Sequence, residues 1–289
     1  DLKLRKYEVK IFDHTFLIPG IRNRSLVQRI RRRLFIKYYN YKINKFFLKI
    51  VDDYKPKIIL ICKGLNLKKS TLKIINNKEI YLINWNPDDF FNKKNSNAEL
   101  INSMSAYDLI ISSRPHLFNQ YKNFGAKELL FIDWYFVPDL HKKRNKEKKY
   151  DVSFVGSWSV EREKYINSLP HRVSIWGGGW EKSSKEFKYS NDLKFKILSQ
   201  EEMSIVFEES TFNLNFITHE NRDLSNLRFF EVPASGGLLV TERNESANSY
   251  FVDGQECIMF STLDELVYRI DNEKNLETIC DSGYKKIHD

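Results

Sequence analysis

The chain has 289 residues, with 47 Lys and Arg against 38 Asp and Glu and a formal net charge of +9 at pH 7. Hydrophobic residues make up 42% of the sequence and aromatic residues 14%, which excludes wholesale disorder. No apolar run approaches the ~20 residues of a membrane-spanning helix, and three widely separated cysteines exclude a disulfide framework and a paired-cysteine metal site. We therefore expect a folded protein of two domains in a reducing cytoplasm.

The first half of the chain alternates between strand-like and helix-like segments. Strands are predicted at 7–13, 57–62, 79–85, 107–112 and 128–133. Helices are predicted in a long basic stretch at 25–53 and at 68–76, 97–106 and 115–123. This alternation predicts an open parallel sheet. The chain opens on a segment that reads as the end of a helix, so we expect a first strand to be missing before it.

The second half shows the same alternation, with clearer turn and helix-capping signals between the segments. Strands are predicted at 151–156, 172–177, 193–198, 211–217, 238–241 and 257–260. Helix starts are marked by Ser159 before an acidic turn and by two capping boxes, Ser199 with Glu202 and Thr262 with Glu265. A further helix is predicted over about 226–235, ending at two glycines.

The charged run at 141–151 has no apolar periodicity and is typical of a linker. The sequence therefore predicts two Rossmann-like α/β domains, an acceptor-side domain at 1–145 and a donor-binding domain at 146–289. Ligands of such sheets bind beyond the carboxyl ends of the strands, which predicts a ligand cleft between the two domains.

The densest polar cluster lies at 225–237 (SNLRFFEVPASGG). In a helix starting near Asn226, Arg228 and Glu231 are three apart and share one face. The helix N-terminus would offer unpaired N–H groups to an anion. The planar guanidinium of Arg228 could bind phosphate oxygens, and the carboxylate of Glu231 could accept hydrogen bonds from ribose hydroxyls. The alternative is a surface ion pair of small worth. Gly236 either ends the helix or allows a ligand close to the backbone.

Two glycine turns follow strands of the same domain. Gly156 and Ser157 follow the first strand, where backbone N–H groups can meet phosphate, or they form an ordinary turn. Gly177 and Gly178 stand in a run of three glycines that either lets a flat base approach or forms a flexible loop. Neither turn matches a dinucleotide-binding or P-loop pattern.

Several motifs together resemble the donor domain of GT-B glycosyltransferases, most closely the CgeB-like spore-maturation group. The similar stretches, in order, are YDVSFVGS, VSIWGGGW, NLNF, RFFEVPASGGLLVT, FVDGQE and DELVYRI, with a looser likeness in ICKG, INWNPDD and YDLIISS. This resemblance implies a sugar-nucleotide donor, with Arg228 and Glu231 on the nucleotide and Glu231 on its ribose. The glycine turn of the family carries over to Gly156.

An inverting transferase needs a base that deprotonates the acceptor hydroxyl. Asp88 and Asp89 follow a predicted strand at its carboxyl end, and His14 follows another; the alternatives are a solvated Asn-Pro-Asp turn and a structural histidine. His219 follows the strand at 211–217 and could contact the sugar or diphosphate. No metal-ligand pattern occurs, so we expect no metal or other cofactor, with Arg228 stabilising the leaving diphosphate.

The stretch at 21–50 is the main basic feature, with apolar residues at helical spacing among arginines. It is compatible with an amphipathic helix on an anionic membrane surface, with binding of phosphate, polysaccharide or nucleic acid, or with a helix whose apolar stripe packs on the sheet.

Three functions remain open from the sequence. The first is a metal-independent transferase that moves a sugar from a nucleotide-sugar donor, expected to be a UDP-sugar, to a hydroxyl of a cell-surface glycan or lipid-linked acceptor, in the cytoplasm or at the membrane periphery. The second is a basic nucleic-acid-binding protein, which is disfavoured because no base-reading motif accompanies the charge. The third is a GT-B homologue that binds sugar nucleotide without turnover.

Overall fold

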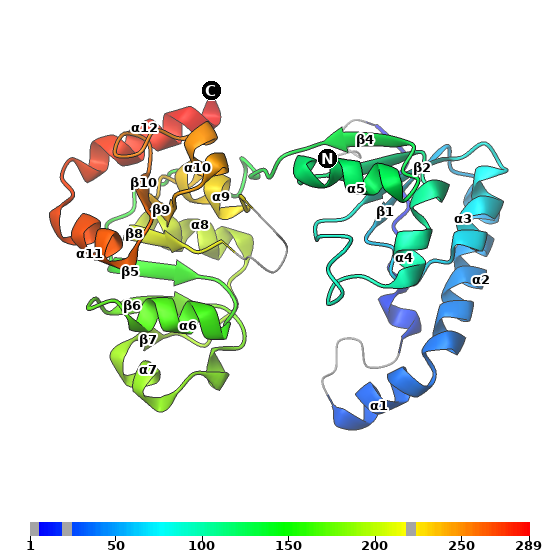
Figure 1. Cartoon of the computed structure of the whole chain (residues 1–289), viewed down its shortest axis with the longest axis horizontal. Helices are drawn as coiled ribbons and strands as arrows, with labels where there is room; N and C mark the ends of the chain where they lie inside the picture. Colours follow the sequence, from blue (N-terminus) through cyan, green and yellow to red (C-terminus); the bar gives the residue numbers. More distant parts are fainter. Residues whose placement is uncertain (1–5, 19–24, 218–223) are drawn as a thin grey trace. The chain divides into compact units, whose positions relative to one another are not determined.

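The computed structural model describes residues 6–18, 25–217 and 224–289, and the chain divides into two compact units, Asp1–Asp133 and Trp134–Asp289. Each unit is built on its own parallel sheet with helices packed against it (Figure 1). The two parallel sheets confirm the predicted fold class.

The first unit has a four-stranded sheet in the order β1-β2-β3-β4. Its strands are β1 Ile58–Cys62, β2 Tyr81–Trp85, β3 Leu109–Ser112 and β4 Glu128–Phe131. Its helices are α1 Leu26–Leu34, α2 Ile36–Tyr54, α3 Lys69–Asn76, α4 Ala98–Asn102 and α5 Phe118–Asn123, with 3-10 turns at His14–Leu17, Met104–Ala106 and Pro115–Leu117. All four strands run parallel because each is followed by a helical crossover.

Two predictions for this unit are corrected. The segment 7–13 forms no strand: it has no ladder partner among the described residues, and its Phe12 stacks on Phe47 of α2 with ring centroids 5.6 Å apart. The predicted helix at 25–53 is broken at Phe35, whose backbone leaves the helical region between α1 and α2.

One face of the four-stranded sheet is open. Ile58 and Leu60 of β1 are 60% and 53% exposed, whereas Ile61 and Leu82, on the opposite face, are buried. Tyr81 and Leu130 extend the exposed face across the sheet. This apolar face is exposed, although parallel sheets are normally covered by helices on both faces.

The second unit has a six-stranded parallel sheet in the order β10-β9-β8-β5-β6-β7. Its strands are β5 Tyr150–Val155, β6 Val173–Trp176, β7 Asp192–Leu193, β8 Ser210–Asn215, β9 Leu239–Glu242 and β10 Ile258–Phe260. Its helices are α6 Val160–Asn167, α7 Lys185–Ser190, α8 Gln200–Glu209, α9 Arg228–Ala234, α10 Glu245–Tyr250, α11 Leu263–Asn272 and α12 Leu276–His288, with a 3-10 turn at Trp180–Lys182. The strand order reverses between β5 and β8, which is where such sheets bind ligands.

Local signals explain most of these boundaries. The capping box of Ser199 and Glu202 is formed at the start of α8, and Ser159 and Thr262 cap α6 and α11. The predicted strand at 193–198 is shorter than expected, since only Asp192–Leu193 pair with β6.

The charged run at 141–151 is not a free linker. Residues 134–149, which we call the entry segment, belong to the second unit. In this segment Arg144 donates from its backbone N–H to Glu208 Oε1 at 2.5 Å and from Nη1 to Ser204 Oγ at 2.8 Å. Hydrogen bonds to α8 therefore attach the entry segment to the second unit, although its sequence has no apolar periodicity. The boundary between the two units lies after Asp133 and not between residues 145 and 146.

Candidate nucleotide-sugar site

Arg228 and Glu231 lie at the strand-order reversal of the second sheet. Arg228 Nε donates to the carbonyl of Val155, the last residue of β5, at 3.3 Å. Its Nη1 forms an ion pair with Glu231 Oε2, and its guanidinium lies over the Phe207 ring. The Glu231 side chain is only 3% exposed. The pair is therefore a buried one, which excludes the surface pair considered from the spacing.

The N-terminus of α9 does not offer the free N–H groups that the sequence predicts. The helix starts at Arg228, later than expected, and the Arg228 N–H donates to Asn226 Oδ1 at 3.0 Å. The next three N–H groups, up to that of Glu231, donate to the carbonyls of Asn226 and Leu227. Asn226 also donates to Asn215 Oδ1 at 2.9 Å, so its amide braces the turn against β8.

His141 of the entry segment faces Glu231 and was missed by sequence reasoning. Its Nδ1 accepts the Val137 N–H at 3.0 Å, which leaves the hydrogen of the neutral ring on Nε2. Nε2 lies 3.7 Å from Glu231 Oε1, is buried, and has no hydrogen-bond partner among the described residues. Burial lowers the pKa of His141, although the Glu231 charge opposes this effect.

A second arginine converges on the end of β5. Arg162 of α6 donates from Nη1 to the Ser157 carbonyl at 2.8 Å and lies over the Phe154 ring. Burial, followed by the nearby charge of Arg228, lowers the pKa of Arg162. Two guanidiniums beside one turn form a local concentration of positive charge suited to a polyvalent anion. The available sequence signal was the position of Arg162 in the first turn of the helix after β5.

The glycine turns serve the fold more than a ligand. The Gly156 N–H donates to Trp176, and its carbonyl accepts from Trp180 Nε1 at 2.8 Å, so the Gly156 N–H is not available to phosphate. A Cβ on Gly177 would lie 2.0 Å from the Gly156 carbonyl oxygen, whereas one on Gly178 would make only ordinary contact with Ile197.

The Ser157 backbone N–H has no hydrogen-bond acceptor in the part of the chain that the structure describes. This N–H is therefore the one from this turn that an anion could use.

Gly236 lies at the opposite end of α9 from Arg228. Its φ is +75°, and a Cβ there would meet the Lys143 side chain at 2.9 Å. These features support helix termination rather than ligand approach. His219 lies outside the described residues.

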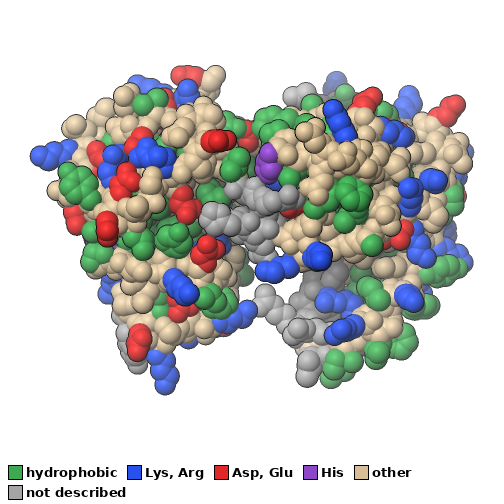
Figure 2. Space-filling view, in the orientation of Figure 1, with side chains coloured by type: hydrophobic (Ala, Val, Ile, Leu, Met, Phe, Trp, Pro, Cys, Tyr) green, Lys and Arg blue, Asp and Glu red, His purple; other side chains and the backbone are tan. Residues whose placement is uncertain are grey.

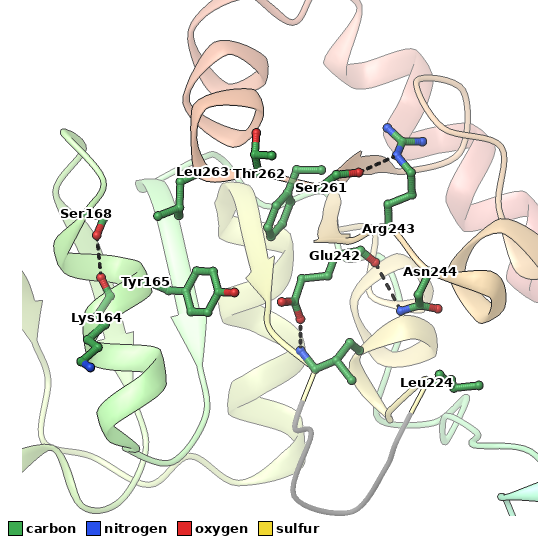
Figure 3. Close-up of a pocket in the computed structure, with 12 residues that line it drawn as sticks. Lys164, Tyr165, Ser168, Leu224, Glu242, Arg243, Asn244, Ser261, Thr262 and Leu263 are labelled. Atoms are coloured by element: carbon green, nitrogen blue, oxygen red, sulfur yellow. Dashed lines mark hydrogen bonds between the residues drawn. The ribbon is translucent and has the colours of Figure 1, made fainter.

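The second unit also has a pocket of about 540 Å³, lined by residues that include Tyr165 and Glu242 (Figure 3). Tyr165 of α6, one turn after Arg162, points its hydroxyl into the pocket, opposite Glu242 at the end of β9. Asn244 and Thr262 add further polar groups to the lining. Glu242 Oε2 accepts the Ile217 N–H, which ties this wall to the end of β8. A pocket lined by hydroxyl, amide and carboxylate groups suits a sugar.

In the first unit, Asp88 and Asp89 follow β2 as predicted but differ in their surroundings. Asp88 forms an ion pair with Lys63, which follows the neighbouring strand β1. Asp89 is buried, and its Oδ1 accepts the Phe91 N–H at 2.8 Å. The alternative of two solvated acids is therefore wrong for Asp89, whose contacts are those of a turn-forming side chain.

His14 begins a 3-10 turn instead of following a strand. Its Nε2 lies 3.0 Å from Asn66 Nδ2 in the loop after β1, and burial lowers its pKa.

The second unit also matches a known family. Residues 155–289 match the family model described as "Glycosyl transferase-like", so this part of the chain is similar to glycosyltransferase domains. No curated protein matches the chain.

Solved structures with the GT-B fold resemble most of the chain. A sucrose-phosphate synthase from Thermosynechococcus elongatus is 11% identical, with a TM-score of 0.64 over 87% of this chain and 73% of that chain. A UDP-forming α,α-trehalose-phosphate synthase from Burkholderia xenovorans is 11% identical, with a TM-score of 0.60 over 87% and 73%. The pneumococcal O-GlcNAc transferase GtfA in complex with UDP and GlcNAc is 13% identical, with a TM-score of 0.56 over 84% and 56%. These similarities show that the chain has the GT-B fold.

Proposed function

We propose that this protein is a glycosyltransferase that binds a UDP-sugar in its second unit and moves the sugar to a hydroxyl of a glycan or lipid-linked acceptor. The observation that carries the proposal is the convergence of Arg162, Arg228 and the buried Glu231 at the strand-order reversal. Two cations and a carboxylate there match the diphosphate and the ribose of a sugar nucleotide.

In this assignment the Glu231 carboxylate accepts hydrogen bonds from the ribose hydroxyls. Arg228 orients that carboxylate through their ion pair and, with Arg162 and the Ser157 N–H, neutralises the diphosphate. Charge develops on the diphosphate as the glycosidic bond breaks, so preorganised guanidiniums favour the transition state. His141 limits the positions that Glu231 can take, because the buried His141 ring lies 3.7 Å from Glu231 Oε1, the oxygen that does not pair with Arg228.

UDP is favoured over other nucleotides because one similar structure is a UDP-forming synthase and another is in complex with UDP and GlcNAc. The sugar of the donor would enter the pocket beside Tyr165, because Tyr165 lines that pocket and lies one turn from Arg162 on α6.

For an inverting reaction we assign the base to Asp88 rather than to Asp89 or His14. Asp88 is partly exposed and paired with Lys63, whereas Asp89 is occupied by the turn that it forms. The carboxylate would take the proton of the acceptor hydroxyl as the new glycosidic bond forms.

The proposal is tested by thermal denaturation with UDP, GDP, ADP and UDP-sugars, followed by a UDP-release assay. A ligand at 100 times its Kd stabilises the folded protein by about 2.7 kcal/mol. We expect UDP and at least one UDP-sugar to raise the melting temperature and that sugar nucleotide to be slowly hydrolysed. Stabilisation without UDP release would identify a binding protein without turnover. No stabilisation by any nucleotide, together with salt-sensitive DNA binding, would support the nucleic-acid alternative instead.

A further inference from the structure

Helix α1 carries an apolar stripe that nothing in the described chain covers. Val27, Ile30 and Leu34 are 75%, 52% and 73% exposed, and their spacing of three and four residues places them on one face. Exposed Phe35 and Tyr38 continue the stripe toward α2. The prediction that the apolar stripe of this region packs on the sheet is therefore wrong for α1.

The comparison with α2 makes the exposure of α1 specific. Tyr39, Ile43, Phe47 and Val51 recur every fourth residue along α2 and are buried in the core of the first unit. Two successive helices thus use their apolar faces differently, because only α2 has a hydrophobic partner.

Arginines border the exposed stripe. Helical geometry places Arg31 and Arg33 on either side of the face formed by Ile30 and Leu34. Among the residues that the structure describes, no carboxylate forms an ion pair with Arg31, Arg32 or Arg33. Hydrophobic and basic side chains are mixed over this end of the first unit (Figure 2).

The chemistry of this face selects one partner. An apolar stripe flanked by cations fits the boundary between the acyl chains and the phosphates of an anionic bilayer. A second copy of the chain would bring the same arginines and repel the first, and nucleic acid would leave the stripe in water. No helix in the described ranges has the length and apolar character needed to cross a membrane.

We propose that α1 docks the protein on an anionic lipid surface, with Val27, Ile30 and Leu34 entering the acyl boundary and Arg31 and Arg33 contacting lipid phosphates. This inference goes beyond the transfer reaction and does not depend on it. Membrane docking would place the enzyme beside acceptors that are carried on lipid.

The experiment is vesicle sedimentation of the full chain. One set of vesicles is pure phosphatidylcholine, and the other is equal parts phosphatidylcholine and phosphatidylglycerol. We expect sedimentation only with the anionic vesicles. Val27→Ser/Ile30→Ser/Leu34→Ser should weaken binding by at least about 10-fold, because the stripe no longer gains from leaving water. Arg31→Gln/Arg33→Gln should weaken it by roughly 30-fold, from about a fivefold loss for each cation.

Two controls separate the face from general charge and apolarity. Lys285→Gln/Lys286→Gln removes two exposed cations of α12 and should bind as the wild type does, as should Val160→Ser on α6. Equal losses in the lysine and arginine variants would overturn the proposal, as would binding to both vesicle types or to neither. A concentration-dependent dimer that the serine variant abolishes, without vesicle binding, would show a second copy as the occupant and also overturn it. Circular dichroism of each variant confirms that it is folded.

Discussion

At the scale of single residues, the site depends on partners that are distant in the sequence. Arg228 and Glu231 could be predicted because they are three apart on a helix beside a glycine pair. His141 could not, because its partner lies on another element and the surrounding charged run is typical of a linker. Arg162 and Tyr165 were missed because only the fold places their helix beside the ends of β5 and β9.

Tyr165 tests the assignment of the pocket. Tyr165→Phe keeps the ring that stacks on Phe216 and removes only the hydroxyl that points into the pocket. We expect unchanged affinity for UDP and about fivefold weaker binding of the UDP-sugar, from the loss of one hydrogen bond. Calorimetric titration with UDP and with the UDP-sugar measures the two affinities. Equal losses of affinity for the two ligands would show that the pocket does not bind the sugar.

His141 predicts an acid sensitivity of the fold. Because its pKa in the folded state is lowered from 6.5, the folded protein resists protonation that the unfolded chain accepts. The free energy of unfolding should therefore be full above about pH 6.5 and fall as the pH decreases below it. The charges near the ring are that of Glu231, which raises the pKa of His141, and those of Arg228 and Arg144, which lower it.

Urea unfolding of His141→Gln measures this effect. The variant keeps a side-chain N–H near Glu231 but does not titrate, so its stability should fall less between pH 7 and pH 5. His14 has a lowered pKa as well, so part of the decline should remain and should be reduced in His14→Gln. Identical pH profiles for the wild type and His141→Gln would contradict the buried neutral imidazole.

Asp88 and Asp89 should separate into a base and a structural residue. Asp88→Asn should keep UDP binding and lower the transfer rate by roughly 100-fold or more if Asp88 is the base. Asp89→Ala should instead lower the free energy of unfolding by about 1 to 2 kcal/mol, because the Phe91 N–H loses its acceptor. Steady-state rates and urea unfolding distinguish the two, and full transfer activity in Asp88→Asn would eliminate it.

At the scale of elements, capping signals placed helices well and hydrophobic runs placed strands well. The errors have physical causes. Residues 7–13 have a strand-like sequence pattern, yet the Phe12 ring packs against aromatic residues of α2 and the segment forms no strand. For the glycines after β6 the sequence left open either the approach of a base or a flexible loop, whereas at Gly177 the close approach is between two turns of the protein itself.

Gly177 and Gly178 form a matched pair for testing that packing. Gly177→Ala should destabilise the protein by more than about 2 kcal/mol, because its Cβ would collide with the Gly156 carbonyl and its φ of +137° disfavours a side chain. Gly178→Ala should cost less than about 1 kcal/mol, since its Cβ meets only Ile197 at 3.4 Å. A melting temperature for each variant decides this. Weakened UDP binding by a stable Gly178→Ala variant would instead show that the base of the nucleotide contacts this turn.

At the scale of the whole molecule, the alternation of strands and helices was enough to predict two parallel α/β units, and the similarity to solved GT-B structures agrees with it. The unit boundary was less predictable, because hydrogen bonds to α8, rather than hydrophobic periodicity, attach the entry segment to the second unit. The net charge of +9 comes partly from α1 in the first unit, whereas the residues proposed to bind the nucleotide belong to the second unit.

The central claim is that Glu231 binds the ribose of UDP in the second unit. Calorimetric titration of UDP into the wild type, Glu231→Gln and Glu209→Gln tests it directly. Glu209 is a matched control, since it is also a buried carboxylate paired with a cation, Lys149, but lies at the end of α8. We predict that the wild type and Glu209→Gln bind UDP alike and that Glu231→Gln binds roughly 10- to 100-fold more weakly. Equal UDP affinity in all three proteins, or no UDP binding by the wild type, would contradict the claim.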